Sequence, residues 1–158
     1  MIQIYTDGSA RGNPGPGGWG AVLISGEHYK ELSGGFECTT NNRMELYAVI
    51  MALEAIKRAN ANIVVCSDSS YVCNAVEKGW LFNWERVGFV KKKNADLWIR
   101  FLKVFRQHKI KFVWVKGHNG HPQNERCDRL AVEASFGQNL PKDLGYLKSI
   151  EQESNLDF

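Results

Sequence analysis

The chain has 158 residues, of which 44% are apolar and 23% charged, with a formal net charge of +3. Such a length and composition are typical of one globular domain with its own core. No apolar run approaches the roughly 20 residues of a membrane span, and no secretory signal is visible at the N-terminus. We therefore expect a cytoplasmic protein without a membrane partner.

The four cysteines are scattered along the chain without any CxxC pair; they are Cys38, Cys66, Cys73 and Cys127. We expect reduced thiols, in keeping with a cytosolic protein. Because the count is even, a disulfide stays open as the alternative interpretation.

The N-terminal half predicts three strands followed by a helix. Residues 1–8 alternate between apolar and polar side chains, which is typical of a strand, and the glycine- and proline-rich residues 12–18 predict a loop. Residues 19–25 and 29–36 are expected to form a hairpin. Residues 39–59 open with capping residues and continue as a long apolar helix.

The C-terminal half alternates strands and helices. The β-branched run 62–69 predicts a buried strand ending near Asp68, and Gly79 ends the helix that follows it. After Gly137 the pattern fades. The remaining predictions are helix 70–79, a helical turn and basic loop over 80–93, helix 95–108, strand 109–117 and helix 122–135.

This order predicts an α/β fold, with a mixed sheet, parallel crossovers and helices on both faces. We expect one domain over 1–148 and a polar, flexible C-terminal tail over 149–158. No sequence feature indicates an obligate protein partner, so a monomer is expected.

Positive charge is concentrated in residues 78–116. This segment holds 11 of the 20 Lys and Arg residues but only 2 of the 17 acidic ones, and it also contains four of the five tryptophans. Basic residues interleaved with aromatic rings suit a nucleic-acid backbone. A solvated helix face with buried tryptophans remains the alternative interpretation.

Four carboxylates are ordinary when each is taken alone. Asp7 fits a turn, Glu45 a capping-box partner of Asn42, Asp68 a helix N-cap and Asp128 a solvated helix face. Together they indicate a site, because Asp7 and Asp68 end strands predicted to be parallel neighbours.

In the predicted sheet all four carboxylates can reach one crevice beyond the strand ends. Converging carboxylates repel one another and need a cation between them. Oxygen-only ligands select Mg²⁺ or Mn²⁺ rather than zinc. We therefore predict a Mg²⁺ site, with two ions when substrate is bound and Mn²⁺ as a possible substitute, suited to in-line displacement at phosphorus.

The stretch KGHNGHPQNERCD, residues 116–128, raises a second possibility. His118, His121 and Cys127 would supply three zinc ligands, but a paired cysteine motif is missing and the fourth ligand would have to be a carboxylate. A mobile imidazole at His118, between two glycines, instead suits transient proton transfer.

The ordered motifs YTDGSARGNPGPGGWG, TTNNRMEL, SDSSYV, KNADLW and VKGHNGHPQNERCDRLA give the chain a family resemblance. The sequence resembles type I ribonuclease H, the cellular endoribonuclease that cuts the RNA strand of RNA/DNA hybrids, from residue 1 to about residue 148. The resemblance implies a five-stranded mixed sheet whose first three strands are antiparallel. It also implies endonucleolytic hydrolysis that leaves 5′-phosphate and 3′-hydroxyl ends.

Residue roles carry over from this resemblance. Asp7, Glu45, Asp68 and Asp128 match the metal-binding carboxylates, and His118 matches a catalytic histidine. The expected substrate-binding residues are Asn13, Asn41 and Asn42 for the minor groove, Thr40 and Asn94 for a DNA-strand phosphate, Trp80 and Trp84 for the sugars of the DNA strand, and Lys91, Lys92 and Lys93 for phosphates.

Three departures bear on substrate affinity. Cys38 stands where many relatives place an arginine, Ser70 stands where glutamine is common, and the basic protrusion around GFVKKK is shorter. Two other functions remain as alternatives. One is a related DNA-processing nuclease or transposase-type module. The other is an inactive hybrid-binding protein, in which one or more of the four carboxylates would be expected to be lost.

Overall fold

The protein folds around one five-stranded sheet in the order β3-β2-β1-β4-β5. The structure is a computed structural model, and it describes residues 1–116 and 121–156. The strands are β1 (Ile2–Ala10), β2 (Gly15–Ser25), β3 (His28–Thr39), β4 (Asn62–Ser67) and β5 (Lys109–Trp114).

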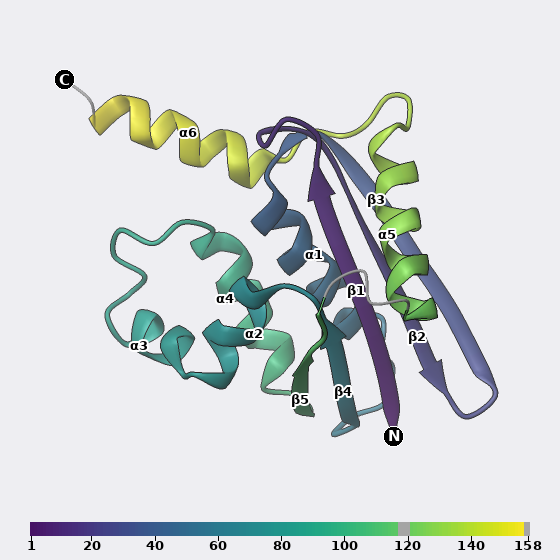
Figure 1. The fold of residues 1–158 in the computed structure, drawn as a ribbon. Coiled ribbons are helices and arrows are strands. Elements are labelled where there is room, and N and C mark those ends of the chain that lie inside the picture. Colours follow the sequence, from purple (N-terminus) through teal and green to yellow (C-terminus); the bar gives the residue numbers. More distant parts are fainter. Residues whose placement is uncertain (117–120, 157–158) are drawn as a thin grey trace.

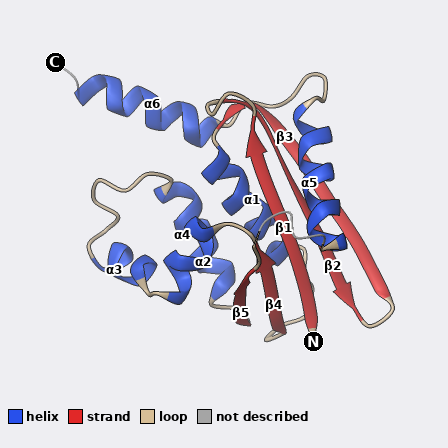
Figure 2. Ribbon diagram, viewed as in Figure 1, coloured by secondary structure: helices blue, strands red, loops and turns tan. Residues whose placement is uncertain are grey.

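The strand directions divide the sheet into two parts. β1 pairs antiparallel with β2, and β2 with β3. On its other side β1 pairs parallel with β4, and β4 with β5. The expected mixed sheet with three antiparallel N-terminal strands is therefore confirmed (Figure 2).

Helices cover both faces of this sheet (Figure 1). In the described chain they are α1 (Asn41–Glu54), α2 (Ser70–Glu77), α3 (Trp80–Arg86), α4 (Ala95–Phe105), α5 (Pro122–Ser135) and α6 (Leu144–Leu156). α5 contacts β1, β2 and β3, whereas α1 contacts β1 and β2 and carries α4 on its outer side.

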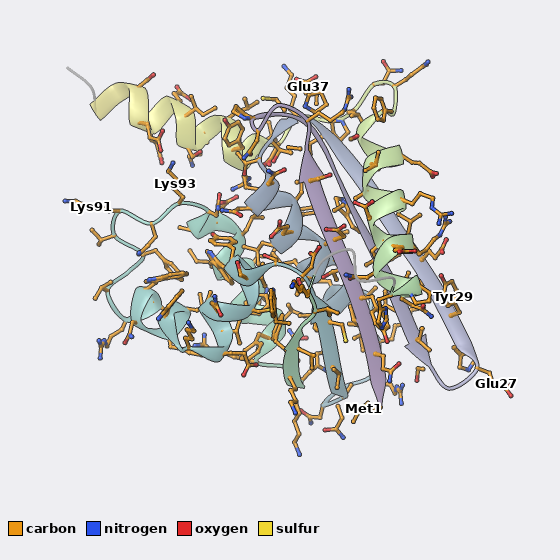
Figure 3. The ribbon with its side chains drawn as sticks, in the orientation of Figure 1. Met1, Glu27, Tyr29, Glu37, Lys91 and Lys93 are labelled. Carbon is orange, nitrogen blue, oxygen red and sulfur yellow. The ribbon has the colours of Figure 1, made fainter. Side chains whose placement is uncertain are left out.

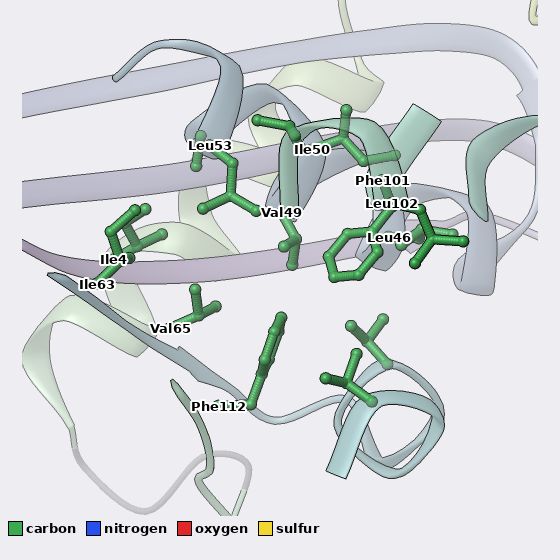
Figure 4. Close-up of a cluster of buried hydrophobic side chains, with 14 of the residues drawn as sticks. Ile4, Leu46, Val49, Ile50, Leu53, Ile63, Val65, Phe101, Leu102 and Phe112 are labelled. Carbon is green, nitrogen blue, oxygen red and sulfur yellow. The ribbon is translucent and has the colours of Figure 1, made fainter. Parts of the chain in front are cut away.

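The main core lies between the sheet and α1 (Figure 4). Ile4 of β1 and Val65 of β4 are fully buried there, against Val49 of α1 and Phe101 of α4. Alternate residues of β1 are buried on this face, as the apolar–polar alternation predicted. Burial of these side chains holds the ends of β1 and β4 in fixed positions.

Several predicted boundaries differ from the structure, and two of them differ most. β2 begins at Gly15, inside the predicted loop 12–18, because Gly17 and Gly18 pair with β1. α1 ends at Glu54 rather than at residue 59. The backbone N–H of Asn60 donates to the carbonyl of Gln107, which turns the chain toward β4.

The C-terminal segment is helical where an irregular tail was expected. Residues 149–156 form the second half of α6, which extends away from the sheet (Figure 1). Its apolar residues Leu144, Leu147 and Ile150 are exposed. They recur at a spacing of three, and Leu, Lys, Gln and Glu favour helices intrinsically.

Two other expectations concern the oxidation state of the cysteines and the presence of membrane-spanning helices. All four cysteines are free thiols, so the disulfide alternative was wrong. Among the residues that the structure describes, none of the helices combines the length and the apolar character needed to cross a bilayer.

Candidate active site

Asp7 and Asp68 directly follow the last residue pair of two neighbouring parallel strands, since β1 and β4 pair up to Thr6 and Ser67. The expectation that the two strands are parallel neighbours is confirmed. Asp7 does not end its strand, however, because β1 continues to Ala10 in its pairing with β2. The backbone N–H of Gly8 donates to the Asp7 carboxylate at 2.8 Å.

Glu45 reaches this edge because β1 and α1 approach each other closely. A Cβ atom at Gly8 would lie 2.3 Å from the carbonyl carbon of Met44 and 2.5 Å from the nitrogen of Glu45. Only glycine permits this backbone contact. The N-cap of α1 is Thr40, which accepts from the nitrogen of Arg43 at 3.2 Å, so Glu45 is not the capping-box partner that was its alternative.

Asp128 is brought in by the packing of α5 on β1 and β2. The thiol of the buried Cys127 donates to the carbonyl oxygen of Tyr5 at 3.2 Å. A Cβ at Gly18 would lie 2.0 Å from the carbonyl oxygen of Ala131. Asp128 is therefore anchored next to the strand that carries Asp7.

The carboxylates influence one another electrostatically. The pKa of Asp7 is raised to about 8, mainly by burial and further by the charges of Asp68, Asp128 and Glu45. A hydrogen bond from Gly8 acts in the opposite direction and lowers this pKa. Burial also raises the pKa of Glu45, helped by Asp68 and opposed by a hydrogen bond with Ser69. Partly buried like charges of this kind favour a bound cation.

The carboxylate oxygens suit a hard divalent cation, although they are not arranged as a complete coordination shell. Within residues 1–116 and 121–156, no three His, Cys, Asp or Glu side chains are grouped closely enough to hold a metal ion. The four carboxylates are all half-buried rather than fully enclosed, so their side chains can still rotate. Carboxylate oxygens from separate elements match what Mg²⁺ and Mn²⁺ accept.

The zinc interpretation of residues 116–128 finds little support. Burial and the nearby Asp7 charge raise the pKa of the Cys127 thiol to about 12, whereas the metal-binding form is the thiolate. His121 precedes α5 and its ring lies 5.1 Å from that of Tyr5. Its Nδ1 is buried and has no hydrogen-bond partner among the described residues. His118 lies outside the described residues.

The asparagines predicted to contact the minor groove form one cluster. The side-chain oxygen of Asn13 accepts from the nitrogen of Asn41 at 3.0 Å, and that of Asn41 accepts from the nitrogen of Ala10 at 2.6 Å. Asn42 is the next residue and is exposed. These bonds tie the 11–14 turn to the start of α1, beside Gly8.

Thr40 and Asn94 are linked through a buried arginine. The guanidinium of Arg43 is 2% exposed and donates to Asn94 at 3.4 Å, to Asp96 at 2.8 Å and to Asp143 at 2.8 Å. Since the backbone of Arg43 is bound to Thr40, both predicted phosphate ligands are held by this residue.

The basic segment presents its cations outward. Lys91 and Lys93 project from the chain between α3 and α4 (Figure 3), and Lys92 lies 4.8 Å from the ring centroid of Trp84. Trp80 is exposed, with Lys78 5.2 Å from its ring. Trp84 is partly buried and packs on Trp98, at a centroid distance of 5.9 Å.

For two residues near the site, no functional role was predicted from the sequence. The exposed Trp114 donates its indole N–H to the carbonyl oxygen of Asp68 at 3.1 Å. Tyr71 accepts a hydrogen bond from Asn94 at 3.0 Å. Tyr71 belongs to the SDSSYV motif, and this motif could have marked it as a residue of the site. Trp114 was predicted only as one of the tryptophans of the basic segment.

A cavity of about 720 Å³ lies away from these residues, lined by parts of β2, β3 and the segment after α1, including Leu23, Lys30 and Arg58. None of the predicted site residues lines it, so it is not part of the candidate site.

Comparison with known proteins agrees with this geometry. The profile of the RNase H family matches residues 1–136. A protein named Ribonuclease H from Desulforamulus reducens is 53% identical over 148 residues, covering 90% of this chain and 92% of the relative. A second, from Aeromonas salmonicida, is 49% identical over 150 residues, covering 92% and 96%.

Among solved structures, LC9-RNase H1 is described as a type 1 RNase H with the type 2 active-site motif. It is 32% identical, with a TM-score of 0.77, and the match covers 88% of this chain and 74% of that one. The matched profile spans all four carboxylates, from β1 to α5. The chain therefore belongs to the RNase H family, as a member of its type I branch.

Proposed function

We propose that this protein is an endoribonuclease that hydrolyses the RNA strand of RNA/DNA hybrids, leaving 5′-phosphate and 3′-hydroxyl ends. The observation that carries this proposal is the parallel pairing of β1 with β4, whose last residue pair is followed directly by Asp7 and Asp68. Glu45, held against Gly8, and Asp128, in α5 packed on β1, would complete a site at the carboxyl ends of the parallel strands, where such sheets bind ligands.

Asp7, Glu45, Asp68 and Asp128 would hold the metal. Enzymes of this family are metal-dependent nucleases, and the oxygen donors favour Mg²⁺, with Mn²⁺ as a substitute and two ions in the substrate complex. Bound divalent ions supply stabilisation of the charge that develops on the phosphodiester oxygens. The chain orients the carboxylates through β1, α1, β4 and α5. His118 would accept or deliver a proton near the reacting oxygens.

Substrate recognition would distinguish the RNA strand of the hybrid from its DNA strand. The linked amides of Asn13 and Asn41, with Asn42, would read the 2′-hydroxyl, which DNA lacks. Thr40, Asn94 and the cations Lys91, Lys92 and Lys93 would bind phosphates without reading bases. Trp80 and the exposed part of Trp84 would pack on sugars.

We further propose that the chain acts as a cytoplasmic monomer with no obligate protein partner. The four free thiols are in keeping with a reducing compartment. A domain over 1–148 with an appended segment over 149–158 is also part of this proposal, and the exposure of residues 150–154 is in keeping with it.

The test compares cleavage of end-labelled RNA/DNA hybrid, double-stranded RNA and double-stranded DNA, each with Mg²⁺ and with a chelator. Only the RNA of the hybrid is expected to be cut, and the chelator is expected to stop cutting. Asp7→Asn should lower kcat by at least about 1000-fold, as expected when a group that stabilises the transition state is lost. Glu27→Gln, in the exposed β2–β3 turn, is the matched control and should cut normally.

The other functions have distinct outcomes in the same assay. Equal cutting of duplex DNA would favour a DNA-processing nuclease. Tight hybrid binding without any cutting, under all metal conditions, would favour an inactive binding protein. Either result contradicts the proposal.

A further inference from the structure

Asp68 is the one of the four carboxylates that lies outside a helix or strand. β4 ends at Ser67 and α2 begins at Ser70, whereas the other three carboxylates lie within β1, α1 and α5. A functional group on a turn keeps its direction only where other contacts hold the turn. The contacts around Asp68 therefore decide where its carboxylate can point.

The residues on either side of Asp68 are held by hydrogen bonds. The backbone N–H of Val115 donates to the carbonyl oxygen of Ser67 at 2.8 Å, and the backbone N–H of Ser69 donates to the Ser67 hydroxyl at 3.1 Å. Ser69 is the N-cap of α2, where its side chain accepts from the backbone N–H of Val72 at 3.1 Å. The turn is thus attached both to the segment after β5 and to α2.

The carbonyl group of Asp68 itself is bound by a side chain of the neighbouring strand. Trp114 is the last residue of β5 and lies opposite Ser67. Its indole N–H donates to the Asp68 carbonyl oxygen at 3.1 Å, and an indole nitrogen can only donate. The rotamers open to a side chain depend on the backbone angles of its residue, so a bond that holds the Asp68 peptide also restricts the Asp68 carboxylate.

Core packing alone does not account for a tryptophan at this position. Trp114 is 55% exposed, whereas Phe112, two residues earlier on the same face of β5, is 4% exposed and belongs to the main core. A phenylalanine at position 114 would also place an aromatic ring there, but it has no hydrogen-bond donor. The N–H group is what distinguishes the residue present.

Asp68 has to face the other carboxylates for a cation to bind between them. Burial raises the pKa of Asp7 and the pKa of Glu45, and the charge of Asp68 raises both further. Ser69 forms a hydrogen bond with Glu45 that lowers the pKa of Glu45. β5 lies on the other side of β4 from β1, so Trp114 contacts Asp68 from the side away from the strand of Asp7.

We propose that Trp114 is a positioning residue of the metal site, whose N–H holds the Asp68 peptide so that the Asp68 carboxylate faces the space shared with Asp7 and Glu45. In this role Trp114 contacts neither the ion nor the substrate. The inference rests on the proposed function, and it gives a role to a residue to which the family resemblance assigned none.

The test measures Mg²⁺ binding in the absence of hybrid, so that it does not depend on cleavage. Mg²⁺ is added stepwise to isotope-labelled protein, and the backbone N–H signal of Gly8 is followed by NMR. Trp114→Phe keeps a ring but removes the donor. Its Kd for Mg²⁺ should be about tenfold higher than that of the unchanged protein, because loss of a partner that orients a metal ligand usually costs roughly 10–100-fold in affinity.

The indole N–H of Trp114 supplies a second signal, which a purely structural role would leave in place. In the unchanged protein it should shift as Mg²⁺ binds and give the same Kd as Gly8, because the ion polarises the Asp68 residue that accepts its bond. In the cleavage assay, the Mg²⁺ concentration at half-maximal rate should rise by the same factor in Trp114→Phe. KM for the hybrid and kcat at saturating Mg²⁺ should stay unchanged.

Two further variants separate the donor from the ring. Trp114→His keeps a donor, because Nε2 of histidine occupies the place in its five-membered ring that Nε1 occupies in indole. At about pH 8, where an ordinary imidazole is neutral, this variant should recover most of the affinity lost in Trp114→Phe. Val113→Thr, on the opposite face of β5 and 39% exposed, is the matched control and should bind Mg²⁺ like the unchanged protein.

Three results would overturn the inference. They are an unchanged Kd in folded Trp114→Phe, an equal loss of affinity in Trp114→Phe and Trp114→His, and no shift of the indole signal on addition of Mg²⁺. Circular dichroism of the metal-free variants checks that they are folded. If the unchanged protein binds Mg²⁺ at both signals but cuts no hybrid, the proposed function fails while the role of Trp114 stands.

Discussion

Asp7 is placed where its charged form is disfavoured. It is half-buried, beside three other carboxylates, and its pKa rises from 3.8 to about 8. Such a group binds a proton more tightly in the folded protein than in the unfolded chain. A divalent cation removes this penalty by occupying the space between the charges.

This shift predicts how stability depends on pH. Between about pH 4 and about pH 8 the folded metal-free protein holds a proton on Asp7 that the unfolded chain releases, so its free energy of unfolding should fall as the pH rises through this range. Asp7→Asn removes the titration and should make the dependence shallower. Urea unfolding with a chelator at about pH 5 and about pH 8 measures this. Equal slopes in both proteins would contradict the pKa assignment.

Arg43 shows how one buried residue can hold three segments. It joins α1 to Asp96 at the start of α4 and to Asp143 before α6, and Asp143 is itself buried and bound by Thr39 at 2.7 Å. Without the arginine, the carboxylate of Asp143 would be left buried and uncompensated.

Arg43→Met is therefore expected to lower the free energy of unfolding by about 3–5 kcal/mol, the usual cost of breaking a buried ion pair. Urea denaturation followed by circular dichroism measures this. Arg106→Met removes an exposed pair with Glu85 and should change stability little. A similar loss in both variants would argue against the special role of Arg43.

At the level of elements, the position of Asp128 depends on how closely α5 approaches β2. Gly18 permits that approach, since its backbone lies against the carbonyl of Ala131. Gly18→Ala should push α5 outward, lower stability by about 1–3 kcal/mol through overpacking, and reduce kcat because Asp128 moves. Thermal unfolding and single-turnover cleavage measure the two effects.

Gly26→Asn is the control for this variant. Gly26 lies in the β2–β3 turn with φ +61° and open space around it, and asparagine tolerates such a conformation. It should leave both stability and kcat nearly unchanged. Full activity in Gly18→Ala would show that α5 does not need this close contact.

The segment between α3 and α4 should control salt dependence. Replacing Lys91, Lys92 and Lys93 together by glutamine should weaken hybrid binding and make the plot of log K against log[salt] shallower by up to about three units, at roughly 0.9 per lost phosphate contact. kcat should be unchanged because these lysines lie between α3 and α4, whereas the carboxylates lie in β1, α1 and α5 and directly after β4.

Binding isotherms at several salt concentrations check this prediction. The control carries glutamine at Lys30, Lys57 and Lys142, which are exposed elsewhere on the molecule. An equal change of slope in both variants would mean that general charge, rather than this segment, drives binding.

For the molecule as a whole, the sequence predicted what depends on local pattern and chain order. Alternation in β1 and the buried run of β4 gave the parallel pair that brings Asp7 next to Asp68. The close backbone contact of Gly8 with Glu45, and the joining of Thr40 to Asn94 by Arg43, depend on tertiary packing and left no periodic signal. α6 was not predicted, although Leu144, Leu147 and Ile150 recur every three positions. The role of His118 stays a prediction.

Truncation tests the proposed division of the molecule. In a chain ending at residue 148, the lost segment includes the exposed residues 150–154, so the rest should fold and cut the hybrid at a rate close to that of the full chain. Circular dichroism and initial rates check this. A large loss of activity would mean that 149–158 belongs to the working domain.

The central strand also has a consequence for synthesis on the ribosome. β1, which carries Asp7, emerges before α5, which brings the last carboxylate more than a hundred residues later. If the proposed site needs all four carboxylates, a nascent polypeptide is expected to have no hydrolytic capacity until α5 has left the exit tunnel. Prematurely terminated products that lack α5 carry an incomplete acidic set and are expected to leave the RNA around them intact.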